Sequence, residues 1–270
     1  TEEELNPVWQ HLLNGEIDNY YPSVTTEVRQ QIDGQNGIHF EVDPACRQLT
    51  SIAINNERFN TNVRKAFDLL IDKDIIGQAM CGDDYEVAGD PLLSTQDYFM
   101  EYTHTRDVET AVAMLEAEGF DFENTVIKLG CSESRQNMAA IIQQMLAEGG
   151  VKCDILVSTT TFADQMSGEL DACLVSNNTK FSPTAHSARF APVTGTMTHT
   201  DDDTIKVLSD KIDFCQDEAE KLELIHELQQ IYWDTCPWIF LYTTSNYIVH
   251  SARLSGVRDI GNRAYTWVVS

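Results

Sequence analysis

Several common functional sequence motifs are missing from this 270-residue sequence, and each absence reduces the number of functions that it could have. No run of about 18 apolar residues occurs, so no segment is predicted to span a bilayer. The sequence has no G-x-G-x-x-G or G-x-x-x-x-G-K phosphate loop, no H-E-x-x-H zinc motif and no G-x-S-x-G elbow, which weakens nucleotide-binding and hydrolase interpretations. Basic residues are scarce: 18 Lys and Arg stand against 43 Asp and Glu, a formal net charge of −25. Such a surface repels phosphate backbones, which disfavours nucleic acid as a partner.

The cysteines form no recognisable metal or redox motif. Seven are present and no pair has C-x-x-C spacing, which argues against a zinc ribbon or a thioredoxin-type pair. Cys153 and Cys173 lie within apolar runs, where a thiol packs as a small hydrophobic group and stays protonated. We therefore expect reduced, largely buried cysteines, with at least one thiol free because the count is odd.

The N-terminal residues contain no basic segment followed by an apolar one, so no signal peptide is expected within this sequence. That observation fits a cytosolic chain, and equally a mature or excised part of a longer one.

Hydrophobic periodicity predicts an α/β chain with a mixed sheet flanked by helices. Helix 134–148, between strands 125–129 and 151–157, predicts a β-α-β crossover with parallel strands. The irregular stretches 81–105 and 177–200 are the longest expected loops, and loops of this length are often functional. Other strands are expected at 38–42, 49–54, 172–175, 238–242 and 246–250, and other helices at 5–13, 23–32, from 61 onward, 107–118, 161–167, 203–214 and 217–233.

Clusters of acidic residues are interpreted as ordinary surface. Asp201–Asp203 next to His199 lacks the alternating ligand spacing of a calcium loop, and a charge cluster at a helix N-terminus is the favoured interpretation. Asp83-Asp84 is taken as solvated surface in the same way. The histidines occur singly and suggest no catalytic triad, although Cys131 with a distant His stays open as a nucleophile.

The segment Asn60-Thr-Asn-Val-Arg-Lys-Ala-Phe-Asp-Leu-Leu-Ile-Asp-Lys-Asp-Ile-Ile resembles the "V-R-x-A … I-D-[RK]-x-x-I" pattern of the family 5 extracellular solute-binding proteins. These are the oligopeptide, dipeptide and nickel receptors of ABC importers. Five further segments resemble that family in the same order: residues 15–18 (G-E-I-D), 49–55, 108–120, 168–172 (G-E-L-D-A) and the run ending at 234–242. Together the six matches cover nearly the whole chain.

The resemblance implies a lobe of the type II periplasmic-binding-protein fold. Family members are longer, and the residues before the 15–18 match normally build a large N-terminal lobe. We therefore expect residues 1–45 to be a segment from the inter-lobe region, residues 46–250 to form the second ligand-binding lobe, and residues 251–270 to return toward the N-terminal lobe.

The implied function is that of the substrate-binding component of an ABC importer. Such a receptor captures a peptide or another small polar solute by closure of two lobes and delivers it to a membrane permease. The implied partners are that ligand, the N-terminal lobe of the same protein and the permease. The implied location is extracytoplasmic, either periplasmic or membrane-anchored at the cell surface. No catalysis, cofactor or metal is expected, and the isolated lobe is expected to fold but to bind ligand weakly.

The resemblance also points to a ligand-binding segment. Peptide receptors of the family carry a W-x-x-D-Y-x-x-P-like stretch whose Asp meets the amino terminus of a peptide. The matching run here is Ser176-Asn-Asn-Thr-Lys-Phe-Ser-Pro183, with Ser176 at the Trp position and Thr179 at the Asp position. Asn177, Asn178 and Thr179, with Ser176, are the expected ligand-binding residues for a neutral polar group; an Asn-rich turn without a ligand is the alternative.

Two other functions stay open from the sequence. One is a receptor-like effector-sensing domain of a cytoplasmic regulator, which would suit reduced cysteines. The other is a thiol-dependent enzyme, which would require a cysteine with a depressed pKa.

Overall fold

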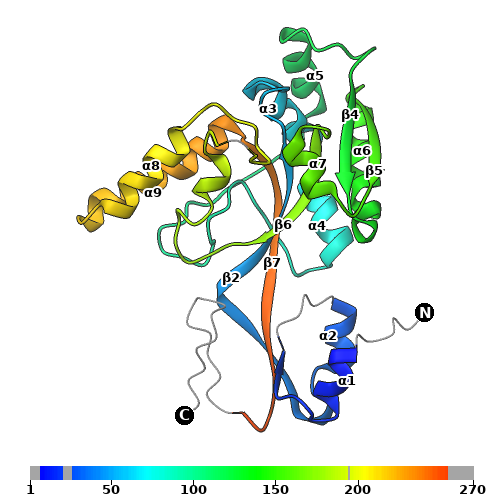
Figure 1. The fold of residues 1–270 in the computed structure, drawn as a ribbon, viewed down its shortest axis with the longest axis vertical. Helices are drawn as coiled ribbons and strands as arrows, with labels where there is room; N and C mark the ends of the chain where they lie inside the picture. The colour runs from blue at the N-terminus through cyan, green and yellow to red at the C-terminus, as the bar shows by residue number, and fades with distance from the viewer. Residues whose placement is uncertain (1–6, 21–25, 194, 255–270) are drawn as a thin grey trace.

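The molecule consists of two bodies joined by two long strands (Figure 1). The structure, a computed structural model, describes residues 7–20, 26–193 and 195–254. The upper body holds most helices and the larger part of the sheet, while the lower body holds α1 (Pro7–Leu13), α2 (Thr26–Ile32) and β1 (Asn19–Tyr20). Among the described residues, no helix is both long enough and apolar enough to span a membrane.

One mixed sheet runs through both bodies in the order β1-β7-β2-β6-β4-β5. Strand β4 is parallel to both of its neighbours, β5 and β6, whereas β2 is antiparallel to both β6 and β7. The bounds are β2 Ile38–Ile54, β4 Val126–Cys131, β5 Lys152–Val157, β6 Ala172–Asn178 and β7 Trp238–Ser251, and the short β3 (Glu86–Val87) pairs with β7. The mixed sheet and the parallel β4–α6–β5 unit are thus confirmed.

The helices of the upper body cover both faces of the sheet (Figure 1). Most match their predicted ranges, but the helical segment after residue 70 was not predicted as a separate helix. The carboxylate of Asp72 accepts a hydrogen bond from the Ile75 amide at 3.0 Å and so caps a new helix. The bounds are α3 Thr61–Leu70, α4 Lys73–Cys81, α5 Val108–Ala117, α6 Gln136–Glu148, α7 Thr161–Ser167, α8 Thr204–Phe214 and α9 Glu218–Thr235.

Alternate residues of β2 point into two different apolar cores. Ile52 and Ile54 pack with the helices α3, α5 and α6 on one face, whereas Leu49 and Ala53 pack with α8 and α9 on the other. This is the burial on both faces that the apolar run 49–54 predicts. A third cluster lies in the lower body and comprises Trp9, Leu12, Ile32, Ile38, Tyr247 and Val249.

The strands β2 and β7 correct the sequence prediction, which divided each of them in two. They pair with each other from Ile38↔Ser251 to Ala53↔Trp238 and pass from one body into the other. The register shifts between Val42, which lies opposite Tyr247, and Arg47, which lies opposite Ser245. A bulge of this kind bends a strand and increases its twist. We call the segments 42–47 and 245–247 the waist.

The cysteines behave as the sequence predicts. All seven are free, and Cys131, Cys153, Cys173 and Cys236 are buried. Burial raises the pKa of the Cys153, Cys173 and Cys236 thiols to about 12.

Candidate functional site

The predicted ligand-binding residues lie at the carboxyl end of β6, where the upper body meets the waist. Ser176 pairs with Thr50 of β2, and Asn178 pairs with Gln48. On the other side of β2, Gln48 lies opposite Thr244 of β7. The end of β6 therefore belongs to the part of the sheet from which the two long strands leave toward the lower body (Figure 1).

Three of the four predicted residues are partly exposed there. The hydroxyl of Ser176 lies 3.0 Å from that of Thr50, while Asn177 makes no side-chain hydrogen bond to a described residue. The side-chain oxygen of Asn178 accepts from the amide of Asn246 at 3.3 Å, and its backbone carbonyl accepts from His186 at 2.9 Å. Asn177 thus has unused donors and an unused acceptor, and Asn178 is tied to the waist through Asn246.

Thr179 is placed differently from the other three. Its side chain is fully buried, and its hydroxyl accepts from the Arg47 amide at 2.9 Å and donates to the Arg47 carbonyl at 3.1 Å. The Thr179 amide donates to the same carbonyl at 2.8 Å. Thr179 therefore links the end of β6 to β2 through buried hydrogen bonds.

A polar network that the sequence interpretation missed crosses the waist. Asp84 was taken as solvated surface, but its carboxylate accepts from the Ser245 hydroxyl at 2.6 Å and from the Tyr247 hydroxyl at 2.8 Å. Tyr247 in turn accepts from Arg29 of α2 at 2.9 Å, and the guanidinium lies over the Tyr247 ring. The partners of Asp84 are more than 160 residues away in sequence, so no local pattern signals them.

Arg47 extends this network on the upper side of the waist. Its guanidinium donates to the Thr243 hydroxyl at 2.9 Å and forms an ion pair with Glu86 at 3.3 Å. Together with the Thr179 contacts, these bonds hold β2, β3, β6 and β7 in one arrangement at the point where the sheet narrows.

The Asp201–Asp203 cluster is confirmed as a helix N-terminus. Asp202 accepts from both the amide and the hydroxyl of Thr204, the first residue of α8, at 2.8 and 2.6 Å. Within the described residues, no group of His, Cys, Asp and Glu side chains is arranged to hold a metal ion.

Two buried ionisable clusters, around Lys73 and around Asp90, lie away from the end of β6. Lys73 is fully buried and pairs with Asp68 at 2.8 Å, with His104 on the other side of that carboxylate. Burial raises the pKa of Asp90 to about 6, although Gln229, Leu92 and Trp233 donate hydrogen bonds to its carboxylate. Neither group contacts Ser176–Asn178.

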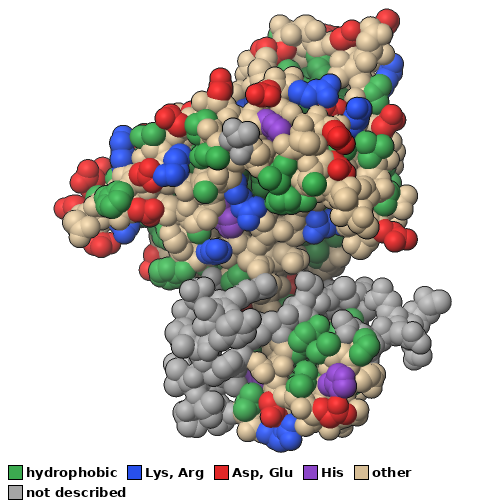
Figure 2. All heavy atoms as spheres, in the orientation of Figure 1, with side chains coloured by type: hydrophobic (Ala, Val, Ile, Leu, Met, Phe, Trp, Pro, Cys, Tyr) green, Lys and Arg blue, Asp and Glu red, His purple; other side chains and the backbone are tan. Residues whose placement is uncertain are grey.

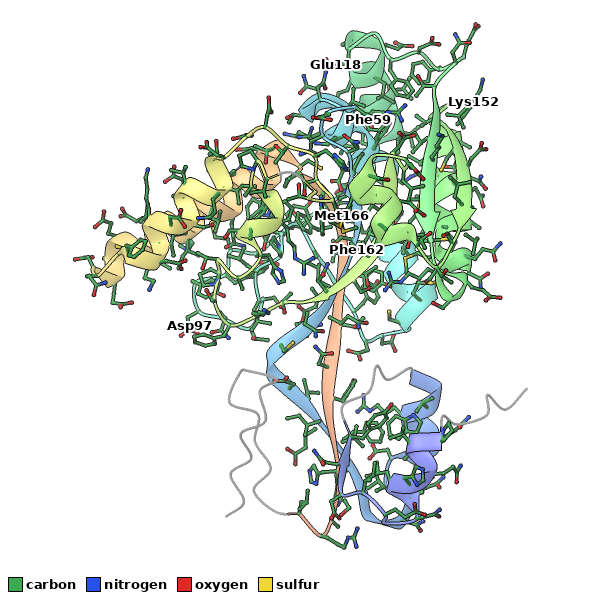
Figure 3. All side chains as sticks on the ribbon, viewed as in Figure 1. Phe59, Asp97, Glu118, Lys152, Phe162 and Met166 are labelled. Carbon is green, nitrogen blue, oxygen red and sulfur yellow. The ribbon has the colours of Figure 1, made fainter. Side chains whose placement is uncertain are left out.

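Four cavities, from about 230 to about 710 Å³, indent the upper body, and other residues line them. The largest lies between the loop that carries Asp97, the segment 181–183 and the start of α9. Figure 3 shows Asp97 on the lower left of the upper body, whereas Phe162 and Met166 lie on α7. Residues 176–179 line none of these four cavities, and we call the surface that they form the wall.

Comparison with known protein families assigns this chain to one of them. The model of the bacterial extracellular solute-binding proteins, family 5 (middle region), matches residues 4–194. The chain belongs to this family. No curated protein matched the chain.

Solved structures of solute-binding proteins share the fold of this family 5 chain. The periplasmic binding protein DppA of Helicobacter pylori, in complex with the peptide STSA, is similar with a TM-score of 0.78 and 18% identity, over 95% of this chain and 53% of that one. The substrate-binding protein CtaP of Listeria monocytogenes gives 0.76 and 18%, over 95% and 55%. NikZ of Campylobacter jejuni, in complex with Ni(L-His), gives 0.76 and 18%, over 95% and 57%. The chain thus spans little more than half the length of these proteins, and the fold predicted from the family 5 motifs is confirmed.

Proposed function

We propose that this family 5 chain is part of the substrate-binding component of an ABC importer. The family match over residues 4–194 carries the proposal. The two-body architecture supports it, because strands that connect two bodies allow hinge closure around a ligand. In this proposal the receptor is extracytoplasmic and delivers its solute to a membrane permease.

The division of the chain into lobes is also a proposal. We assign residues 46–250 to the second ligand-binding lobe and residues 1–45 to the inter-lobe region. The register shift between Val42 and Arg47 supports a boundary near residue 45. On β7 the same shift lies between Ser245 and Tyr247, and Tyr247 packs in the lower body, so the second lobe would end near residue 246 rather than 250. The return segment 251–270 lies outside the described residues from 255 onward. The apolar cluster formed by α1, α2 and the distal ends of β2 and β7 would then continue into the N-terminal lobe.

The proposed ligand contacts are Ser176, Asn177 and Asn178. Hydroxyl and amide groups at the end of β6 suit a small polar solute. The alternation along the strand places Ser176 and Asn178 on one face of the sheet and Asn177 on the other. Thr179, which the sequence places with them, is proposed as a positioning residue because its hydroxyl is already bonded to Arg47 on both sides. A peptide is a candidate solute, since DppA of Helicobacter pylori holds one, but it would be anchored without an Asp at position 179.

A non-catalytic role agrees with the state of the thiols. Burial raises the pKa of Cys81, Cys131, Cys153, Cys173 and Cys236. Since the thiolate is the nucleophile, these cysteines are poorly suited to catalysis at neutral pH. A thiol-dependent enzyme is therefore not favoured, and neither is a cytoplasmic regulator, because the family is extracellular.

The experiment that tests the proposal is native mass spectrometry of the full-length gene product, purified without denaturation. A co-purified mass that resolves into short peptides would identify a peptide receptor with an amino-terminus anchor outside position 179. A single non-peptide mass would identify another solute. A full-length protein that retains nothing, and that binds nothing in a screen of peptides, amino acids and their nickel complexes, would contradict the proposal.

A further inference from the structure

Arg189 differs from the other arginines that the structure describes. Each of those donates a hydrogen bond or forms an ion pair, as Arg47 does with Glu86 and Arg64 with backbone carbonyls. Arg189 is half-buried, yet its guanidinium has no such partner among the described residues. Burial lowers its pKa, and no carboxylate of the described residues offsets that effect. A half-buried cation without a counter-charge is costly, and it is unexpected in a protein with a net charge of −25.

The short helix that carries Arg189 begins beside the wall formed by the end of β6. Arg189 lies in the short helix Ser187–Phe190, directly after His186, whose ring donates to the Asn178 carbonyl at 2.9 Å. Lys180 follows the strand two residues after Asn178 and is exposed. Burial first, and then the positive charges of Arg189 and Lys180, lower the pKa of His186 to about 4. Lys180 is two residues from Asn178 and Arg189 is three residues from His186, so the hydrogen bond between the His186 ring and Asn178 brings both stretches of backbone to the end of β6.

Acidic groups are sparse around these two cations. Along the segment 180–190, the described hydrogen bonds include one carboxylate, that of Asp213, which accepts from the Thr184 hydroxyl at 2.7 Å. No ion pair joins Lys180 or Arg189 to a described acidic residue. Figure 2 shows Lys, Arg and His side chains on the lower front of the upper body, while Asp and Glu crowd its outer ends.

The charge of this wall is the reverse of what the peptide-receptor pattern implies. That pattern places Asp at the position of Thr179 and Tyr at the position of Lys180, so a carboxylate would meet a cationic amino terminus. In this chain the carboxylate is replaced by a buried hydroxyl, and the next residue is a cation.

We propose that Lys180 and Arg189 bind an anionic group of the ligand, a carboxylate or a phosphate, next to the amide of Asn177. This inference rests on the receptor function proposed above and specifies the class of its solute. A guanidinium offers paired donors that match a carboxylate or phosphate, and an ammonium adds a point charge. The ligand supplies the counter-charge that Arg189 lacks among the described residues, and the neutral donors of Asn177 orient it.

The test uses the full-length protein and two simple anions as probes. Thermal unfolding is measured in potassium acetate and in potassium phosphate, each compared with potassium chloride at equal ionic strength. A site with a Kd of about 5 mM predicts a rise in Tm of about 2–4 °C at about 50 mM anion. The two arms separate carboxylate from phosphate binding.

Matched variants assign the effect to the site. Arg189→Gln and Lys180→Gln should remove the rise, and Arg189→Lys should keep part of it because the charge remains. Lys152→Gln, at the far edge of the sheet on β5 (Figure 3), should respond as the wild type does. Lys180 is exposed, so its substitution tests the site even if Arg189→Gln proves unstable.

The inference is overturned if both anions raise the Tm equally in the wild type, in Lys180→Gln and in Arg189→Lys, or in none of them. A retained solute without an anionic group overturns it as well, while the receptor function stands. Conversely, anion binding through Lys180 and Arg189 in a protein that neither retains nor binds any solute supports the site and contradicts the receptor.

Discussion

At the residue scale, the family motifs of this chain specify structure more than ligand contact. Arg64, the arginine of the V-R-x-A pattern, is buried and donates to the carbonyls of Phe59, Thr235 and Cys236. Cys236 has a φ of 42°, in the left-handed region, and makes the turn from α9 into β7. Asp171 of the G-E-L-D-A match is also buried, accepts from the Lys128 amide at 2.8 Å and pairs with Arg58. These side chains form hydrogen bonds with backbone groups at the junctions between helices and strands.

Replacing Arg64 with Lys should destabilise the protein by about 2–3 kcal/mol, because one ammonium cannot reach all three carbonyls that the separate N–H groups of the guanidinium reach. Urea unfolding followed by circular dichroism measures the change. Lys128→Gln, an exposed substitution on β4, is the control and should stay within about 0.5 kcal/mol of the wild type. An Arg64→Lys protein as stable as that control would show that water replaces the lost donors.

Asp90 makes stability depend on pH in a defined direction. Burial raises its pKa to about 6, so the folded protein holds a proton that the unfolded chain releases near pH 4. The stability from this proton is complete below pH 4 and is lost as pH rises through 6. His186 acts in the opposite sense, since burial lowers its pKa to about 4, so the Asp90 contribution must be isolated with a variant.

Asp90→Asn should destabilise the protein more at pH 4.5 than at pH 7, by about 2 kcal/mol. The variant cannot titrate, whereas its amide opposes the donors Gln229 and Trp233 at every pH. Urea unfolding at both pH values gives the two differences. Asp97→Asn, on an exposed side chain, should show no such change. An equal cost of Asp90→Asn at both pH values would contradict a raised pKa.

At the scale of elements, the waist is where the sequence was least informative. Residues 43–48 (D-P-A-C-R-Q), which contain a proline, and the polar residues 243–246 (T-T-S-N) interrupt the apolar patterns of β2 and β7. The sequence therefore predicts two short strands in each place. Pairing between the two strands across about 200 residues keeps them continuous instead, and such a long-range partner leaves no local trace. The β-α-β unit was predictable because its helix and strands carry their own periodicity.

The predicted site also has features that local sequence predicts and features that depend on tertiary contacts. The position of residues 176–178 at the end of a strand follows from local pattern and from the resemblance to the family. The burial of the Thr179 side chain depends on its hydrogen bonds to Arg47. The position of the short helix that carries Arg189 depends on the hydrogen bond between His186 and Asn178. Sequence reasoning could name the segment, but not which of its side chains face outward.

Tyr247→Phe should loosen the waist, because the hydroxyl alone connects Asp84 of the upper body with Arg29 of the lower body. Amide hydrogen exchange of the peptide that spans residues 245–249 should accelerate about tenfold, the equivalent of one or two lost hydrogen bonds. Tyr20→Phe on β1 is the matched control, since the Tyr20 hydroxyl makes no hydrogen bond to a described residue. Unchanged exchange in Tyr247→Phe would mean that strand pairing alone sets the rigidity of the waist.

At the scale of the whole molecule, the end of β6 is one open wall. The similar solved structures are nearly twice as long as this chain, and binding sites of small solutes enclose most of the ligand surface. The 270-residue chain should therefore bind the solute of the full-length protein at least about 100-fold more weakly, a difference of about 2.7 kcal/mol. Isothermal titration of both proteins with the retained solute measures this. Equal affinities would place the whole site within the chain.

The two long strands also fix the order in which the bodies are completed during synthesis. β2 emerges early, but its partner β7 ends only at Ser251. Tyr247 and Val249 of β7 complete the apolar cluster around Trp9 and Leu12. The lower body, which contains the N-terminal helices, can therefore complete its apolar core only after β7 has been made. Until then the nascent chain exposes an unpaired β2 edge, a common starting point for misassembly. A stop codon before Trp238 would leave both bodies without β7, one of the two strands that they share.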